Sequence, residues 1–171
     1  TTNKPEKTLL SGKKRTGGRN SQGKMTMKFI GGGHKKRYRT IDFKRNRHDD
    51  VSEVMSIEYD PNRTAFIALI KFDDDEKKYI IALKGLKVGT KIVSGIKKSP
   101  DIGNCMPLSD IPLGTIISCI EMSPGKGAAI ARSAGSFAQL MARDGKFVTV
   151  KMPSGETRMI LSVCYATIGS V

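Results

Sequence analysis

The chain is 171 residues long, which is enough for one compact domain or two small ones. Hydrophobic residues make up 38% and charged residues 27%, a balance that favours a folded protein over a disordered one. The formal net charge of +14 indicates a polyanionic partner, most simply a nucleic acid. No apolar run approaches the roughly 18 residues of a spanning helix, and the chain begins without the apolar stretch of a signal peptide. We therefore expect neither a membrane partner nor a small-molecule substrate.

The positive charge is concentrated at the start of the chain. Residues 1–48 hold 15 Lys and Arg against two acids, whereas residues 49–171 hold 15 against 14. Blocks of like charge with interspersed glycines are typical of arms that bind phosphates, although a solvated tail used for solubility is the alternative. We expect this arm to order only against its polyanion. The candidate contacts in it are Lys13, Lys14, Arg15, Arg19, Asn20, Lys24, His34, Lys35, Lys36, Arg37, Arg39, Lys44, Arg45 and Arg47.

The first half of the chain predicts short strands broken by turns. Alternating apolar residues predict a first strand over residues 25–29, just before three glycines. Further strands are expected over residues 54–59, 65–72, 78–83 and 91–94, with a Pro-bearing turn at 60–63. Four consecutive acids at 73–76 form the expected tip of a hairpin, and we expect them to be solvated rather than to bind a metal.

The second half continues in the same manner. Residues 106–108 and 111–114 contain Pro and are expected to form a linker and the entry to a strand. Strands are then expected over residues 115–122, 137–143, 146–152, 157–161 and 162–168, with a tight hairpin at Asp144-Gly145. Strands at this spacing, without long helical patterns, indicate two small all-β barrels rather than one large barrel. Both OB-like and SH3-like barrels are candidates, and both can present loops to nucleic acid.

Motifs for catalysis are missing from the sequence. It contains neither a P-loop nor a GxSxG elbow, and its two histidines, His34 and His48, both lie in the basic segment. Three widely spaced cysteines predict reduced thiols in or near the core rather than disulfides or a zinc site. We therefore expect no catalytic residue, no metal and no cofactor. The rival classes are a single-strand nucleic-acid binder, which would need more aromatic stacking platforms, and an enzyme acting on RNA, which would need an acid/base pair.

Two arginines stand apart in the nearly neutral part of the chain. Arg63 follows a Pro-Asn turn, and Arg132 lies between small residues. Such surroundings allow a rigid partner to approach closely, but each arginine could equally form a surface ion pair. The residues alone leave both roles open.

Several stretches in chain order together resemble one known family. They are Gly17-Gly18-Arg19-Asn20, Gly31-Gly32-Gly33-His34-Lys35, Asp42-Phe43-Lys44-Arg45, Glu58-Tyr59-Asp60-Pro61-Asn62-Arg63, Gly85-Leu86, Ile111-Pro112-Leu113-Gly114, Pro124-Gly125-Lys126-Gly127, Ala131-Arg132-Ser133-Ala134-Gly135 and Ala142-Arg143-Asp144-Gly145. The sequence resembles the universal large-subunit ribosomal protein two family in its bacterial or organellar form. The resemblance covers the RNA-binding core of that family, whose members usually extend further at both ends.

The resemblance implies a basic arm over residues 1–24, an OB-like barrel over 25–104 that includes a basic loop at 31–48, and an SH3-like barrel over 105–171. It implies binding to large-subunit ribosomal RNA, with Arg63, Arg132 and Lys126 among the contacts. It further implies a structural role in subunit assembly and association and around the peptidyl-transferase centre. Other ribosomal proteins, and small-subunit contacts at the subunit interface, are the implied partners. The implied location is the ribosome of the bacterial cytoplasm, a mitochondrion or a plastid.

Overall fold

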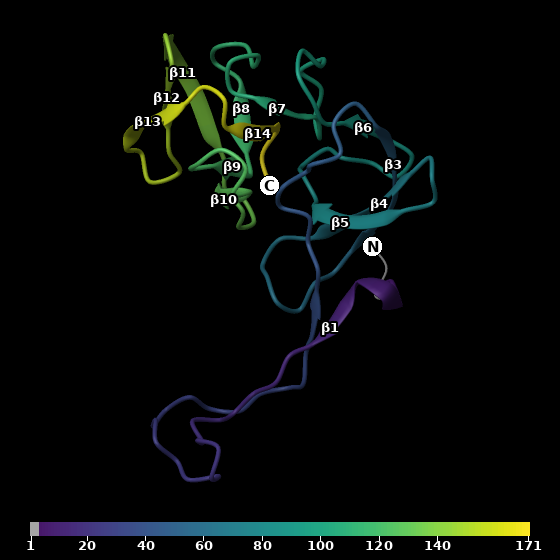
Figure 1. Cartoon of the computed structure of the whole chain (residues 1–171), viewed down its shortest axis with the longest axis vertical. Coiled ribbons are helices and arrows are strands. Elements are labelled where there is room, and N and C mark those ends of the chain that lie inside the picture. The colour runs from purple at the N-terminus through teal and green to yellow at the C-terminus, as the bar shows by residue number, and fades with distance from the viewer. Residues whose placement is uncertain (1–3) are drawn as a thin grey trace.

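The computed structural model describes residues 4–171, which form an almost entirely β protein. Two barrel-like bodies lie side by side, and a long ribbon extends away from them (Figure 1). The one helical element of the described chain is a single 3-10 turn, η1 (Lys7–Leu9), and none of the described helices could cross a membrane. The structure confirms the expected all-β fold of an OB-like barrel followed by an SH3-like barrel.

The first barrel contains a four-stranded antiparallel sheet in the order β5-β4-β3-β6. Its strands are β3 (Val51–Glu58), β4 (Ile67–Phe72), β5 (Lys77–Ile81) and β6 (Lys91–Val93). Strand β4 is buried on both faces, because Ile67 packs into one apolar cluster with Tyr79 and Ile70 into a second cluster with Val54. This double burial explains why the sequence of β4 is a continuous apolar run rather than an alternating one.

The second barrel is a six-stranded sheet in the order β13-β12-β11-β8-β14-β7. Its core is a single cluster in which Leu140, Val148 and Val150 are completely buried. The side chains of β12 alternate between buried and more exposed positions, as a strand with one solvated face requires. The strands are β7 (Cys105–Pro107), β8 (Ile116–Ser118), β11 (Ala138–Asp144), β12 (Phe147–Lys151), β13 (Thr157–Leu161) and β14 (Tyr165–Ile168).

The basic ribbon is a long hairpin. Strand β1 (Leu10–Gly12) pairs antiparallel with β2 (Arg37–Arg39), and residues 13–36 run out from this base and return (Figure 1). The strand predicted over residues 25–29 is wrong: the described chain has only an isolated bridge there, between Arg19 and Met25. The alternation misled the prediction because Met27 and its apolar neighbours are exposed, so no buried face lies behind the pattern.

Two features of the second half also differ from expectation. The stretch read as a linker contains strand β7, and Pro107 is tolerated because β7 lies at the edge of its sheet. The single strand expected over residues 115–122 is broken at Cys119, whose φ of 50° ends β8. The chain then starts β9 (Ile120–Glu121), which pairs with β10 (Ala128–Ile130). Strands β1, β2 and β10 had no signal strong enough to predict them, and the domain boundaries remain predictions.

The two barrels are in direct contact. Val171 lies between them and packs against both apolar clusters of the first barrel (Figure 1). The carbonyl of Val171 accepts a hydrogen bond from the N–H of Gly135 at 2.9 Å, and the carbonyl of Ser170 accepts one from Lys84 at 2.8 Å. The end of the described chain therefore ties the second barrel to the first.

Candidate nucleic-acid interface

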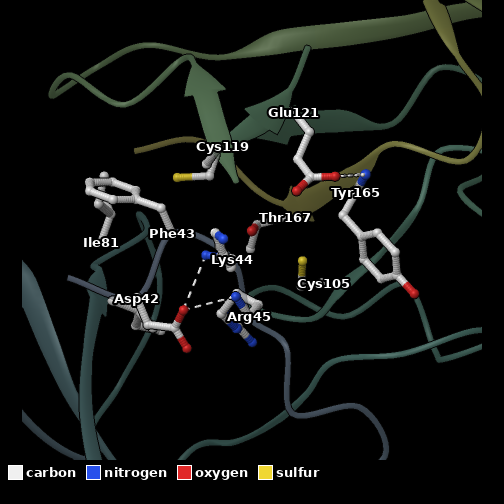
Figure 2. Close-up of a pocket in the computed structure, with 12 residues that line it drawn as sticks. Asp42, Phe43, Lys44, Arg45, Ile81, Cys105, Cys119, Glu121, Tyr165 and Thr167 are labelled. Carbon is white, nitrogen blue, oxygen red and sulfur yellow. Dashed lines mark hydrogen bonds between the residues drawn. The ribbon is translucent and has the colours of Figure 1, made fainter. Parts of the chain in front are cut away.

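Residues 42–45 form a tight turn at the junction of the barrels. The Asp42 carboxylate accepts hydrogen bonds from the backbone N–H groups of Lys44 at 3.1 Å and Arg45 at 2.9 Å (Figure 2). This Asx-type turn is what an Asp in this position favours, and it leaves Arg45 with a φ of 52°. The turn separates three side chains: Phe43 packs towards Ile81 and Cys119, Lys44 stays at the surface and Arg45 is buried.

The second barrel holds this turn from the other side. The Phe43 carbonyl accepts a hydrogen bond from the N–H of Ala128 at 2.8 Å. Gly127 must be a glycine here: its φ is 88°, and a Cβ would lie 3.2 Å from the Phe43 carbonyl oxygen. The buried Glu121 carboxylate fixes the same loop, since it accepts the N–H group of Gly127 at 2.9 Å. It also accepts the N–H group of Tyr165 at 3.1 Å (Figure 2).

Arg63 and Arg132 meet at Phe43. The Cζ of Arg63 lies 5.8 Å from the centre of the Phe43 ring, and that of Arg132 lies 5.0 Å from it. Both distances allow a cation–π contact, which presents each guanidinium in a defined place. Residues from the two barrels, 69 positions apart in the sequence, thus form one positively charged surface around a shared aromatic ring.

Arg63 is also held by an acid. Its Nε donates to the Asp60 carboxylate at 2.7 Å, and the Asp60 side chain is completely buried. Burial raises the pKa of Asp60, but hydrogen bonds from Arg63 and Asn62 outweigh that effect and leave the pKa below its ordinary value. Asp60 is therefore a permanent anion at neutral pH that orients Arg63, whose other guanidinium nitrogens have no partner among the described residues.

A groove of about 530 Å³ runs beside this turn. Leu9, Ile41 and Phe43 line it with apolar surface. Four lysines from both barrels surround it: Lys44, Lys77, Lys78 and Lys126. Lys77 and Lys78 form ion pairs with Glu6 and Glu76, whereas the ammonium groups of Lys44 and Lys126 have no partner in the described chain. The carboxylates of Asp42 and Glu76 also line the groove, so Lys44 and Lys126 are the cations that it offers to the phosphate of a nucleotide whose base packs on the apolar floor.

A much smaller cavity of about 20 Å³ lies behind the turn, among Cys105, Cys119 and Thr167 (Figure 2). It has the size of a water molecule rather than of a ligand. Burial raises the pKa of Cys119 to about 12 and also raises the pKa of Cys105, so both thiols are protonated at neutral pH. Reactive cysteines need the opposite shift, and within residues 4–171 no group of side chains could hold a metal ion.

Three candidate arginines of the basic segment are buried or paired with other parts of the protein. Arg45 is buried and donates to the Ser94 hydroxyl at 3.0 Å and the Gly103 carbonyl at 3.3 Å. Arg39 is buried at the base of the arm. Arg47 pairs with carboxylates of Asp50, Asp74 and Glu76 and lies 4.4 Å from the centre of the Phe72 ring. The acidic hairpin tip therefore neutralises a cation of the basic segment.

The remaining candidates lie on the arm, away from the junction. The Asn20 side chain closes a turn by accepting the N–H groups of Gln22 and Lys24 at 3.0 Å. Lys36 is partly buried, and Arg19 donates to the Gly17 carbonyl at 2.8 Å. The others are exposed: Lys13, Lys14, Arg15, Lys24, His34, Lys35 and Arg37. Sequence reasoning missed Lys77 and Lys78, because only the fold brings that strand beside the turn. It also missed the central place of Phe43, for which the Asp42-Phe43-Lys44-Arg45 motif was the available signal.

The fold and this surface define a two-barrel β protein with an extended basic arm, a construction suited to nucleic-acid binding. Comparison with known protein families gives two matches, one for each part of the chain. The family described as "Ribosomal Proteins L2, RNA binding N-terminal domain" matches residues 6–94, and "Ribosomal Proteins L2, C-terminal domain" matches residues 101–171. The chain belongs to the ribosomal protein L2 family, as its motifs predicted.

Curated relatives agree with this assignment. The chain is 68% identical over its whole length to the large ribosomal subunit protein uL2 of Flavobacterium johnsoniae and covers 62% of that protein. It is 67% identical to the protein of the same name from Flavobacterium psychrophilum, again covering 62%. For Cytophaga hutchinsonii uL2 the identity is 63% and the coverage 61%. The chain thus spans about three fifths of the length of these relatives.

Proposed function

We propose that this chain binds and stabilises large-subunit ribosomal RNA as a structural constituent of the large ribosomal subunit and that it is not itself catalytic. The observation that carries the proposal is the meeting of Arg63 and Arg132 at Phe43. A guanidinium held in place loses little freedom when it pairs with a phosphate, so two such groups on one rigid surface favour a partner of fixed shape. Folded RNA is such a partner, because its grooves are recognised mainly by shape and backbone.

The arm supplies the second part of the interaction. Ten cations and no acid lie between residues 10 and 39. None of these cations belongs to an ion pair within residues 4–171. Lys and Arg side chains in this state displace counterions from RNA, which gives affinity without sequence preference. The arm then strengthens binding, while the junction determines where on the RNA the chain binds. Membership of the ribosomal protein L2 family supports a role in subunit assembly and association and around the peptidyl-transferase centre.

The family and the names of the relatives support the remaining parts of the proposal. The partners are large-subunit ribosomal RNA and other ribosomal proteins, with small-subunit contacts at the interface. The bacterial relatives favour the ribosome of a bacterial cytoplasm over that of a mitochondrion or plastid.

Binding of the purified chain to a large-subunit ribosomal RNA transcript from Flavobacterium johnsoniae tests the proposal, with poly-U as competitor. Arg63→Ala and Arg132→Ala should each weaken binding by about 5- to 150-fold, because each removes an oriented guanidinium from the interface. Arg158→Ala is the matched control, since Arg158 is an exposed arginine paired with Glu156 on the outer strand β13. If both junction variants bind the transcript as tightly as the Arg158 variant, or if poly-U competes as well as the transcript itself, the proposal fails.

A further inference from the structure

The far end of the arm has a defined shape although it has no core. The Gly18 carbonyl accepts hydrogen bonds from the N–H groups of Thr26 at 2.9 Å and Met27 at 3.2 Å. Gly18 has a φ of 78°, and a Cβ on it would lie 2.1 Å from the Met27 carbonyl oxygen, so only glycine fits here. Together with the turn closed by Asn20, these bonds hold residues 18–27 as a compact loop.

This loop and the residues after it carry an exposed apolar cluster. Phe29 is fully exposed at 101%, and Met25, Met27 and Ile30 are 52–60% exposed. Phe29 also has a φ of 62°, a conformation that aromatic residues rarely adopt. Nothing within 4 Å would meet a Cβ on Gly31 or Gly32, so the space beside Phe29 is open for a ligand. Four large apolar side chains on one small loop are more than scattered exposure explains.

The charge around the cluster decides what can cover it. Arg19 and Lys24 lie within the loop, Lys28 directly follows it, Arg15 precedes it, and no acid occurs between Lys7 and Ile41. An apolar protein surface would have to approach through a field of uncompensated cations. A nucleic acid brings anions and flat apolar faces together, and base stacking on aromatic side chains tolerates any base.

We propose that the tip of the arm is a nucleobase-binding site in which Phe29 stacks on an unpaired base of large-subunit ribosomal RNA. Met25, Met27 and Ile30 cover the edges of the base, and Lys24 and Lys28 pair with its flanking phosphates. This inference rests on the proposed function and adds to it a site for single-stranded RNA, 33 residues or more from the junction arginines in sequence. The arm then contributes a specific contact as well as charge.

The absence of Trp from the whole sequence makes the site directly observable. Phe29→Trp introduces a single tryptophan whose fluorescence a stacked base quenches. Titration with the Flavobacterium johnsoniae large-subunit RNA transcript should quench it at the same RNA concentration at which binding saturates. Phe147→Trp is the matched control, because Phe147 is an exposed Phe on strand β12 of the second barrel, and its fluorescence should change little.

Affinity measurements complete the test. Phe29→Ala should weaken binding of the transcript by about 5- to 150-fold. Phe29→Leu should weaken it nearly as much, because leucine keeps apolar area but cannot stack. Both variants should fold normally, since Phe29 contacts no core cluster. Full binding by Phe29→Leu, or binding by Phe29→Trp without quenching, would overturn the stacking site.

Two further outcomes distinguish a failure of the tip site from a failure of the proposed function. If Phe29→Ala binds like the unmodified chain while Arg63→Ala and Arg132→Ala lose affinity, the tip site fails and the proposed function stands. If the unmodified chain shows no preference for the transcript over poly-U, the proposed function fails even where Phe29→Trp is quenched.

Vesicles of phosphatidylserine and phosphatidylcholine test whether the tip binds a membrane instead. A blue-shifted, brighter Phe29→Trp signal with vesicles and no quenching by RNA would replace the nucleobase site by a membrane contact.

Discussion

The arm and the barrels of this molecule are stabilised in opposite ways. In the barrels, three apolar clusters are sealed from water, and cations such as Arg47, Lys71 and Lys98 lie against carboxylates. In residues 10–39 of the arm, large apolar side chains such as Phe29 are exposed, and no cation forms an ion pair with an acid of the described chain. A basic residue is therefore a candidate for nucleic-acid contact where the fold leaves some of its donors free, as it does for the cations of the arm and for the outer guanidinium nitrogens of Arg63. The far end of the arm is shaped by hydrogen bonds to backbone groups rather than by an apolar core.

The largest expected effect tests the contrast in packing. Leu140→Ala removes a completely buried side chain from the core of the second barrel and should lower the free energy of unfolding by about 2–5 kcal/mol. Met27→Ala removes a similar apolar volume from the arm, where Met27 is 60% exposed. This substitution should change the free energy of unfolding by about 0.5 kcal/mol or less. Urea denaturation followed by circular dichroism measures both. Equal losses would show that the arm is part of the cooperative fold.

The next effect tests the contrast in charge. Replacing Lys35 and Lys36 with Gln removes two unpaired arm cations and should reduce the slope of log affinity against log salt by roughly 1.4–1.8. The loss of affinity between about 50 and 200 mM salt should then be about tenfold smaller than for the unmodified chain. The matched pair is Lys71 and Lys98, which are paired with Asp75 and Asp49 in the barrels. Their replacement should leave the slope nearly unchanged. Equal slopes for the two double variants would remove the distinction between paired and unpaired cations.

The same contrast explains how much of the fold the sequence could predict. Strands such as β4 and β12 were predicted because burial in their own sheet produces their pattern. Strand β2 could not be predicted, because Arg37 to Arg39 pair with β1 through backbone atoms and their side chains show no apolar periodicity. The strand expected at residues 25–29 failed for the converse reason, since its apolar alternation faces solvent. Periodicity reports packing within one chain and is silent about surfaces made for another molecule.

Some residues of the candidate site could be predicted from local motifs, and others could not. Arg63 and Arg132 were named from motifs, but their meeting at Phe43 depends on the contact between the barrels, which no local pattern encodes. Lys77 belongs to a strand whose sequence shows only a hairpin, and its place beside the groove follows from the pairing of Ile41 and Asp42 with Tyr79 of the same strand. Arg45 shows the opposite case: it stands in a basic run, yet it is buried against Ser94 and Gly103. Charge patterns locate a binding region, and tertiary structure selects the residues within it.

The smallest effect concerns the acid that holds Arg63. Because the folded-state pKa of Asp60 lies below its ordinary value of 3.8, its contribution to stability is fully present above about pH 3.8 and is lost as the pH falls through the lowered pKa. Asp60→Asn should therefore lower the free energy of unfolding at pH 7 by about 1 kcal/mol, and the gap to the unmodified chain should close as the pH falls below 3.8. Urea denaturation at pH 7, 5 and 3 measures the gap. Asp144→Asn, at the exposed end of β11, should show none. A gap for Asp60→Asn that persists unchanged at pH 3 would mean that shape rather than charge holds Arg63, so that neutralising Asp60 by pH would leave RNA affinity intact.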